Sequence, residues 1–250
     1  MQDYLLLAVA GFAAGAVNAV AGGGSLITFP ALLHCGLPSV VANATNTIAI
    51  WPGTVSSAWA YRRLIYGERR QALRLALPSL FGGLVGSVLL FHAGEAVFRA
   101  VVPWLILFAC ALLAAQDAVA RLVAARQPRG IRGGACWLVA AQLLVAVYGG
   151  YFGAGIGILM LAVLGSFMPD NLQGANALKV LFSLLTNGAA AIVFLAAGVV
   201  ALPEGLLMAV ASLAGGFAGA CFAQRLSPTV LRGVVVSYGL VVAAILFVEG

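Results

Sequence analysis

Long apolar runs cover most of this chain, and short polar connections separate them. A run of 18 or more apolar residues is long enough to cross a hydrocarbon core of about 30 Å as a helix. Within these runs the apolar positions do not alternate with polar ones, so the pattern is not that of half-buried strands. The chain is therefore predicted to be an all-α polytopic membrane protein.

The two halves of the chain align without a gap at an offset of 133 residues. This offset places Gly22 on Gly155, and it superimposes two copies of a Ser-x-x-Gly-Gly-x-x-Gly motif that begin at Ser79 and Ser212. Coincidence between apolar helices would produce shared leucines and alanines rather than this motif. We therefore predict two homologous halves, each with the same series of elements.

Each half is expected to contain four longer helices and one short apolar segment. The first repeat, residues 1–118, has predicted helices at about 4–20, 40–61, 72–92 and 97–118 and a short segment at 25–35. A basic cytoplasmic linker covers residues 119–133. The second repeat, residues 134–250, has predicted helices at about 135–150, 174–197, 204–223 and 229–248 and a short segment at 158–168. This gives about eight transmembrane helices plus two short broken or re-entrant segments.

A glycine cluster interrupts each half directly before its short segment. The first break is at Gly22-Gly23-Gly24, and the second spans Gly153 to Gly157. Duplicated halves with helices broken at matching places are typical of secondary transporters, whose substrate binds near the membrane midplane. Unpaired N–H groups at the start of a half-helix carry about half a positive charge, which suits an anion. The pattern predicts an anion site at the two breaks.

The relative direction of the two halves stays open at this point. Residues 62–74 contain five arginines and residues 121–132 contain four, so both connections are predicted to be cytoplasmic. If the short segments do not cross the membrane, the halves run parallel; if they complete a crossing, the halves are inverted. Twelve residues reach only about 18 Å as a helix, which favours parallel halves. The arginines at 225 and 232 favour inversion, because inversion puts them on the cytoplasmic side.

Composition supports a membrane location and excludes several classes of partner. The chain is 63% hydrophobic and 8% charged, whereas a soluble domain carries about 25% charged residues. The net charge of +6 comes mainly from arginines in the connections, so it does not indicate nucleic-acid binding. The four cysteines are scattered without paired spacing, so neither disulfides nor a metal site is predicted, and no cofactor is expected.

Lys179 is the only lysine in the chain, and it follows directly on the second break. It lies about six residues into the predicted helix 174–197, at a depth of about 9 Å. A cation inside a membrane costs about 2.5–3.5 kcal/mol unless it is paired or hydrated. We interpret Lys179 as a counter-charge for the substrate, the alternative being a side chain that reaches the interface. Its counterpart at the 133-residue offset is Asn46, which is also polar.

Several catalytic and energy-coupling devices are missing. No predicted span has a central Asp or Glu, so a carboxylate relay for protons lacks its parts. A phosphate-binding loop that ends in Lys-Ser or Lys-Thr is also missing, as are a plausible triad and paired carboxylates, so an enzyme is not predicted. A dianion that leaves a negative interior gains about 2.3 kcal/mol per charge per 100 mV. We therefore expect transport to be driven largely by the membrane potential.

Two half-motifs resemble those of the sulfite exporter TauE/SafE family. The run from Ala21 to Leu33, AGGGSLITFPALL, followed by Thr45-Asn46, resembles the first, and YGGYFGAGIG, followed by Lys179 and Asn187, resembles the second. The resemblance covers essentially the whole chain. It implies an integral membrane permease associated with export of sulfite, sulfoacetate and related organosulfonates. This chain departs from many relatives at Ala154, where they have proline between the glycines.

The breaks and the resemblance together predict a substrate site. Its candidate residues are Asn18, Gly22, Gly23, Gly24, Ser25, Thr45, Asn46, Tyr151, Gly153, Gly155, Gly157, Lys179 and Asn187. We expect a secondary transporter for a small sulfur-containing anion, multi-pass in the lipid bilayer of a bacterial inner (plasma) membrane. An anion channel that uses the same pocket is the alternative, and a purely structural membrane subunit is a further one.

Overall fold

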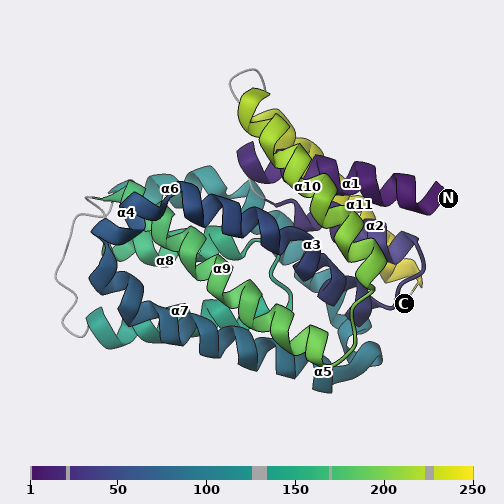
Figure 1. The fold of residues 1–250 in the computed structure, drawn as a ribbon, viewed down its shortest axis with the longest axis horizontal. Coiled ribbons are helices and arrows are strands. Elements are labelled where there is room, and N and C mark those ends of the chain that lie inside the picture. Colours follow the sequence, from purple (N-terminus) through teal and green to yellow (C-terminus); the bar gives the residue numbers. More distant parts are fainter. Residues whose placement is uncertain (1, 21–22, 126–133, 169–170, 223–227, 250) are drawn as a thin grey trace.

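The computed structural model describes residues 2–20, 23–125, 134–168, 171–222 and 228–249. These residues form eleven α-helices and no strand, so the predicted all-helical class is confirmed (Figure 1). The helices are α1 (Gln2–Val20), α2 (Ser25–His34), α3 (Ser39–Ala60), α4 (Arg62–Gly67), α5 (Arg69–Ala114), α6 (Gln116–Ala125), α7 (Gly134–Tyr151), α8 (Ile156–Phe167), α9 (Leu172–Ala196), α10 (Leu202–Phe222) and α11 (Pro228–Glu249).

The long helix α5 consists of two arms that meet at Gly94. Gly94 has φ 73° and ψ 173°, which is not helical and which a side chain would oppose. We call residues 69–93 the first arm of α5 and residues 95–114 its second arm. The sequence predicted two helices here, at 72–92 and 97–118.

Helix α6 occupies part of the region that the sequence predicted to be a linker from residue 119. Residues 116–125 contain four alanines and a leucine, which are strong helix formers. Val119 also packs against the hydrophobic core, which holds this helix on the protein. The short helix α4 was likewise not predicted.

Small residues allow two pairs of helices to pack closely. A methyl group at Gly15 of α1 would lie 2.8 Å from the backbone nitrogen of Gly216 in α10. In the second pair, a methyl group at Gly86 of α5 would lie 2.7 Å from the backbone nitrogen of Tyr151 in α7. Contacts this short are possible only without a Cβ atom, as in other small-xxx-small interfaces.

Both close pairs are parallel. Along α1, Gly11 faces Met208 and Gly15 faces Ser212, so the contacts advance in the same direction on α1 and α10. Along the first arm of α5, Gly82 faces Leu143 and Gly86 faces Val147, so α7 runs with that arm. The directions of α10 and of the first arm of α5 therefore decide the directions of α1 and α7.

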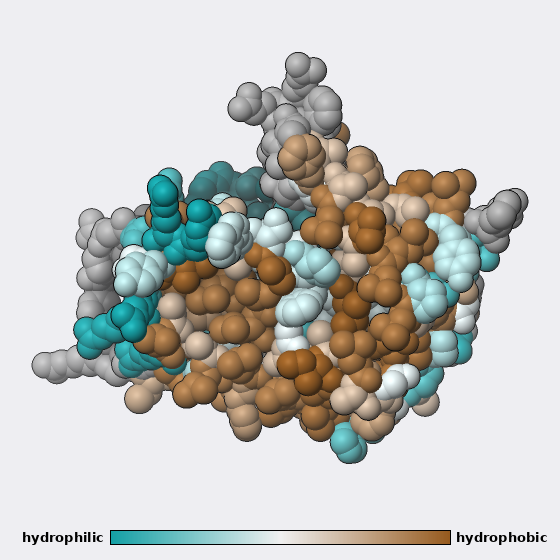
Figure 2. Space-filling view, viewed as in Figure 1, coloured by the Kyte–Doolittle hydropathy of each residue, from teal (hydrophilic) through white to brown (hydrophobic). Residues whose placement is uncertain are grey.

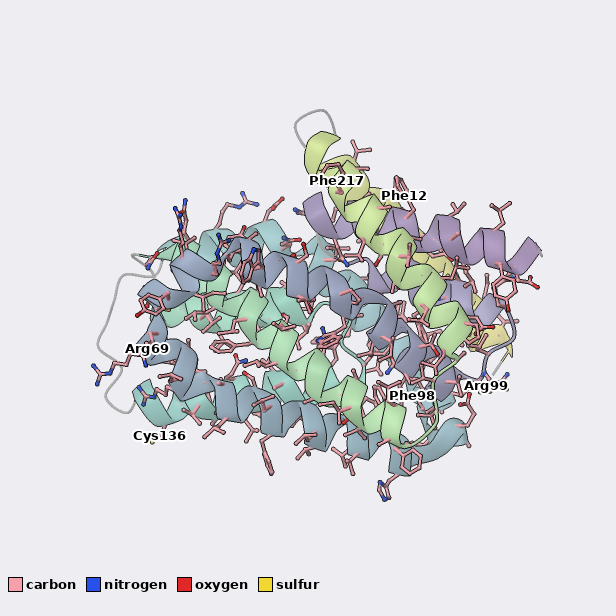
Figure 3. All side chains as sticks on the ribbon, viewed as in Figure 1. Phe12, Arg69, Phe98, Arg99, Cys136 and Phe217 are labelled. Atoms are coloured by element: carbon pink, nitrogen blue, oxygen red, sulfur yellow. The ribbon has the colours of Figure 1, made fainter. Side chains whose placement is uncertain are left out.

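The two ends of the molecule are defined by contacts near the two ends of the first arm of α5. Asn171, just before α9, donates its side-chain N–H to Oε1 of Glu68 at 2.6 Å, next to the start of the first arm. The Val40 N–H, at the start of α3, donates to Oε2 of Glu95 at 2.9 Å, next to Gly94. We call the first end, with residues 62–74, the arginine-rich side, and the other the opposite side; Arg69 and Arg99 mark them in Figure 3.

The first arm of α5 and α10 run in opposite directions. The first arm leaves the arginine-rich side, whereas α10 runs with α3 toward it. The Ala201 N–H donates to Oγ1 of Thr45 at 3.0 Å, and farther along Ser212 donates to the Ala49 carbonyl at 3.0 Å. The α1–α2 hairpin therefore enters from the opposite side, and the α7–α8 hairpin enters from the arginine-rich side (Figure 1).

The outer surface of these helices is strongly apolar. Leu77 is 74% exposed and Phe217 is 76% exposed, and brown hydrophobic surface dominates the view in Figure 2. Arg69–Ala114 and Gln173–Ala196 are long and apolar enough to span a membrane, and six shorter apolar helices accompany them. A contiguous apolar surface of this extent on a helical protein indicates contact with lipid.

Candidate functional site

The first break separates α1 from α2. Gly23 has φ 89°, a left-handed conformation that glycine adopts without strain. The backbone N–H of Gly24 donates to Oδ1 of Asn18 at 2.8 Å, and this hydrogen bond stabilises the turn between α1 and α2. Ser25 begins α2 and is buried. Gly22, also predicted for the site, lies outside the described residues.

The second break separates α7 from α8 and contains two left-handed glycines. Gly153 has φ 81° and Gly155 has φ 76°. The Tyr148 hydroxyl donates to the Ala154 carbonyl at 2.6 Å, and the Tyr148 carbonyl accepts the Phe152 N–H at 2.9 Å. These bonds hold the break in one conformation, and φ above zero requires glycine at both positions.

The two breaks lie close to one another in the fold. The Asn43 side chain on α3 donates to the Tyr151 carbonyl at 3.0 Å, at the end of α7. Phe29 of α2 packs edge-on against Phe152, with 5.6 Å between the ring centroids. The contact between Phe29 and Phe152 therefore joins the two hairpins, and the Asn43 hydrogen bond joins α3 to the end of α7.

The second arm of α5 lies behind both breaks. A methyl group at Gly23 would lie 2.8 Å from Cδ2 of Leu113, and one at Gly155 would lie 3.3 Å from Cδ1 of Leu112. Phe98, which lies on this second arm and is labelled in Figure 3, packs against Tyr151 of α7 with 5.6 Å between the ring centroids. The second arm of α5 thus packs against both breaks.

Asn46 faces the first hairpin, whereas Thr45 does not. The Thr28 hydroxyl of α2 donates to Oδ1 of Asn46, and Asn46 is 2% exposed. Thr45 accepts the Ala201 N–H and contacts Gly205, so it joins α3 to the start of α10. The structure therefore separates these neighbouring residues: Asn46 lies at the first hairpin, and Thr45 has a helix-packing contact.

Lys179 and Asn187 lie along the second hairpin. A methyl group at Gly157 would lie 3.6 Å from Cδ of Lys179, and one at Gly153 would lie 3.9 Å from Oδ1 of Asn187. Lys179 is half-buried and Asn187 is 5% exposed. Among the described residues no carboxylate forms an ion pair with Lys179; Asp170 lies outside them. The aliphatic part of the Lys179 side chain therefore lies beside the first turn of α8.

The arrangement is suited to an anion. Helices α2 and α8 begin at the two breaks and run away from them toward opposite sides, and the residue before each helix is a glycine, Gly24 and Gly155. The positive ends of both helix dipoles consequently point to the middle of the protein. Lys179 adds a full positive charge beside α8. In the described part of the chain, no three His, Cys, Asp or Glu side chains gather as metal ligands would.

Some residues at the breaks were not among the predicted site residues. Thr28, Asn43 and Tyr148 connect the breaks to neighbouring helices, and Phe29 packs against Phe152. Polarity next to the glycine clusters was the available signal for the first three residues. Nothing in the sequence pairs Asn43 with the Tyr151 carbonyl, because the two residues are far apart in the chain.

Comparisons with known proteins agree with this architecture. A model of the family described as "Sulfite exporter TauE/SafE" matches residues 7–246, which confirms the resemblance seen in the sequence. A "Probable membrane transporter protein" of Haemophilus influenzae is 28% identical over 249 residues, 96% of this chain and 92% of that protein. "Probable membrane transporter protein ORF9" of a Sinorhizobium species is 26% identical, with 97% and 94% covered. "Probable membrane transporter protein YfcA" of Escherichia coli K12 is 28% identical, with 90% and 82% covered.

Proposed function

The chain belongs to the sulfite exporter TauE/SafE family and is a membrane transporter, and from this premise we propose that it is a secondary transporter for a small anion, sulfite or an organosulfonate. The observation that carries the proposal is the pair of half-helices, α2 and α8, that begin at the glycine breaks with Lys179 beside the second. The anion binds between the breaks, near the midplane of a bacterial inner membrane that the chain crosses several times.

Three kinds of group recognise the anion in this proposal. The positive ends of the α2 and α8 helix dipoles supply a favourable potential, and the Lys179 ammonium supplies charge. The side-chain amides of Asn46 and Asn187 supply further donors for oxygen atoms of the ligand. Glycines at 23, 153 and 155 adopt positive φ, which lets the chain turn at each break into the half-helix that follows.

We further propose that the two halves are inverted repeats around this site. The opposite directions of α10 and the first arm of α5 support inversion, because these helices correspond at the 133-residue offset. Corresponding residues also touch each other: Trp51 donates to the Leu184 carbonyl at 3.3 Å, and a methyl group at Gly239 would lie 3.8 Å from Cγ2 of Ile106. Contacts between counterparts are expected on a two-fold axis. The arginine-rich side is then cytoplasmic.

Cysteine labelling tests the inversion. Cys35 follows α2 on the opposite side, and Cys136 lies near the start of α7 on the arginine-rich side. We expect a membrane-impermeant maleimide to label Cys35 in intact cells, but to label Cys136 and Ser166→Cys, near the end of α8, only after permeabilisation. Labelling of Cys35 and Ser166→Cys from the same side would contradict inverted halves.

Ligand binding and transport test the proposed function. Purified protein should be stabilised by sulfite or an organosulfonate such as sulfoacetate, by about 2.7 kcal/mol at a hundredfold excess over the dissociation constant. Proteoliposomes should take up the stabilising anion. If none of the compounds sulfite, sulfate, thiosulfate, sulfoacetate and taurine shifts the unfolding temperature or is transported, the proposal is wrong. Unitary currents in planar bilayers would instead identify the same site as a channel.

A further inference from the structure

A groove on the outer surface lies apart from the two breaks. It is bounded by α3, α4, α5 and α9 near the arginine-rich side and has a volume of about 430 Å³, within the range of small-ligand sites. Leu73, Leu181 and Leu184 form apolar walls. In Figure 2, hydrophilic side chains over α4 border the hydrophobic surface beside this helix. The groove plays no part in the transport site proposed above.

Two arginines line this otherwise apolar groove, Arg62 and Arg69. Arg62 donates from Nη1 to the Trp59 carbonyl at 2.9 Å, and its guanidinium carbon lies 4.7 Å from the centre of the Trp59 ring. These contacts orient the guanidinium but use only one of its five N–H groups. Both arginines are exposed.

In the part of the chain that the structure describes, no carboxylate pairs with the positive charges at the groove. Glu68 is the only acidic residue between residues 61 and 74, and its Oε1 accepts a hydrogen bond from Asn171 at 2.6 Å. Within the described residues neither Arg62 nor Arg69 forms an ion pair. The groove therefore combines an apolar wall with two guanidinium groups that have no carboxylate partner among the described residues.

We propose that this groove binds an anionic phospholipid. An acyl chain lies against the leucine walls, and the phosphate of the headgroup accepts hydrogen bonds from Arg62 and Arg69, as guanidinium geometry favours. Trp59 and Tyr66, which are 69% and 73% exposed, line the same groove, and such amphipathic rings prefer the headgroup region. Basic pockets between helices on the cytoplasmic side are suited to anionic headgroups.

A neighbouring groove offers an internal comparison. It has a volume of about 450 Å³ and is lined by Trp51, Pro52, Val55, Ser56, Trp59 and Leu213, with no charged residue. The two grooves thus have similar volumes and mostly apolar linings, but only the first is lined by charged residues. Only the groove with the arginines should distinguish an anionic lipid from a zwitterionic one.

Fluorescence quenching by brominated lipids tests the proposal on the full chain. Variants that retain Trp59 or Trp104 as the single tryptophan are reconstituted with dibromo-phosphatidylglycerol or dibromo-phosphatidylcholine at varied mole fraction. Trp104 is 63% exposed on the second arm of α5, away from the groove. We expect the anionic lipid to quench Trp59 at a much lower mole fraction than the zwitterionic lipid, with no such difference for Trp104.

Substitution of the arginines then tests the assignment. In the Trp59 background, R62Q/R69Q should reduce the preference for phosphatidylglycerol by about 25-fold, from about fivefold per arginine. R63Q/R70Q removes the same charge from adjacent residues that do not line the groove, and should retain most of the preference. Equal quenching by the two lipids in the parent, or equal losses in both double variants, would overturn the proposal. If R62Q/R69Q does not fold, the comparison of Trp59 with Trp104 decides alone.

Discussion

Replacing Gly86 by alanine should force α5 and α7 apart. The added methyl group would lie 2.7 Å from the Tyr151 nitrogen and 3.0 Å from the Gly150 carbonyl carbon, and closer still to the Val147 carbonyl oxygen. All three are backbone atoms, so no rotamer change can relieve the contact. Overpacking of this kind costs about 1–3 kcal/mol, and the better helix propensity of alanine returns up to about 1 kcal/mol.

Gly53→Ala is the matched control, because Gly53 lies inside α3 with nothing within 4 Å of an added methyl group. Helix propensity alone should make this variant more stable, by up to about 1 kcal/mol. The free energy of unfolding is measured by titrating sodium dodecyl sulfate into mixed micelles. The reasoning fails if Gly86→Ala unfolds at the same fraction of sodium dodecyl sulfate as the parent or at a higher one, while Gly53→Ala behaves as expected.

Three further predictions concern the breaks, an ion pair and the driving force. Gly153→Ala and Gly155→Ala should each cost about 1–2 kcal/mol from positive φ and reduce transport in proteoliposomes; full transport by both would contradict a structural need for glycine. Asp117, beyond the end of α5, forms an ion pair with Arg232 at 2.6 Å, and the hydrogen bond and charge of Arg232 lower the pKa of the Asp117 carboxyl. The ion pair therefore stabilises the folded protein above about pH 3.9, and its contribution is lost as the pH falls through the lowered pKa. Thermal unfolding of Asp117→Asn should lack that acid dependence, and an unchanged pH profile would exclude a role for the pair. Export of a dianion should increase with a potassium-diffusion potential, at about 2.3 kcal/mol per charge per 100 mV, and flux independent of potential would exclude electrogenic transport.

Local elements of this fold could be read from the sequence because apolar runs and glycine clusters are local signals. The sequence predicted helices from about residue 40 and residue 174, and α3 begins at Ser39 and α9 at Leu172. Helix α6 was not expected, because a charged stretch with Asp117 and Arg121 reads as a connection although its alanines favour a helix. A break in a helix is marked in the sequence by a cluster of glycines, whereas a surface helix such as α6 has no comparable marker.

Contacts between distant segments could not be read in the same way. Thr45 and Asn46 are adjacent polar residues on one helix, yet their side chains bond to different partners, the Ala201 N–H and Thr28. The sequence does not show how α3 is rotated about its axis. It therefore could not predict that Thr45 packs against α10 while Asn46 faces the first hairpin. The pairing of α1 with α10 likewise depends on a close approach between glycines at positions 15 and 216, which only tertiary structure reveals.

Anion affinity in a Lys179→Met variant tests the central idea most directly, because the substitution keeps the side-chain volume and removes the charge beside α8. Arg74→Gln, an exposed arginine on the same side, serves as the control for loss of one positive charge. Isothermal titration of both purified variants with the anion that stabilises the parent should show affinity lost by at least about tenfold, or 1.4 kcal/mol, in Lys179→Met, and unchanged in Arg74→Gln. Parental affinity in a folded Lys179→Met protein would contradict an anion site at the glycine breaks beside Lys179.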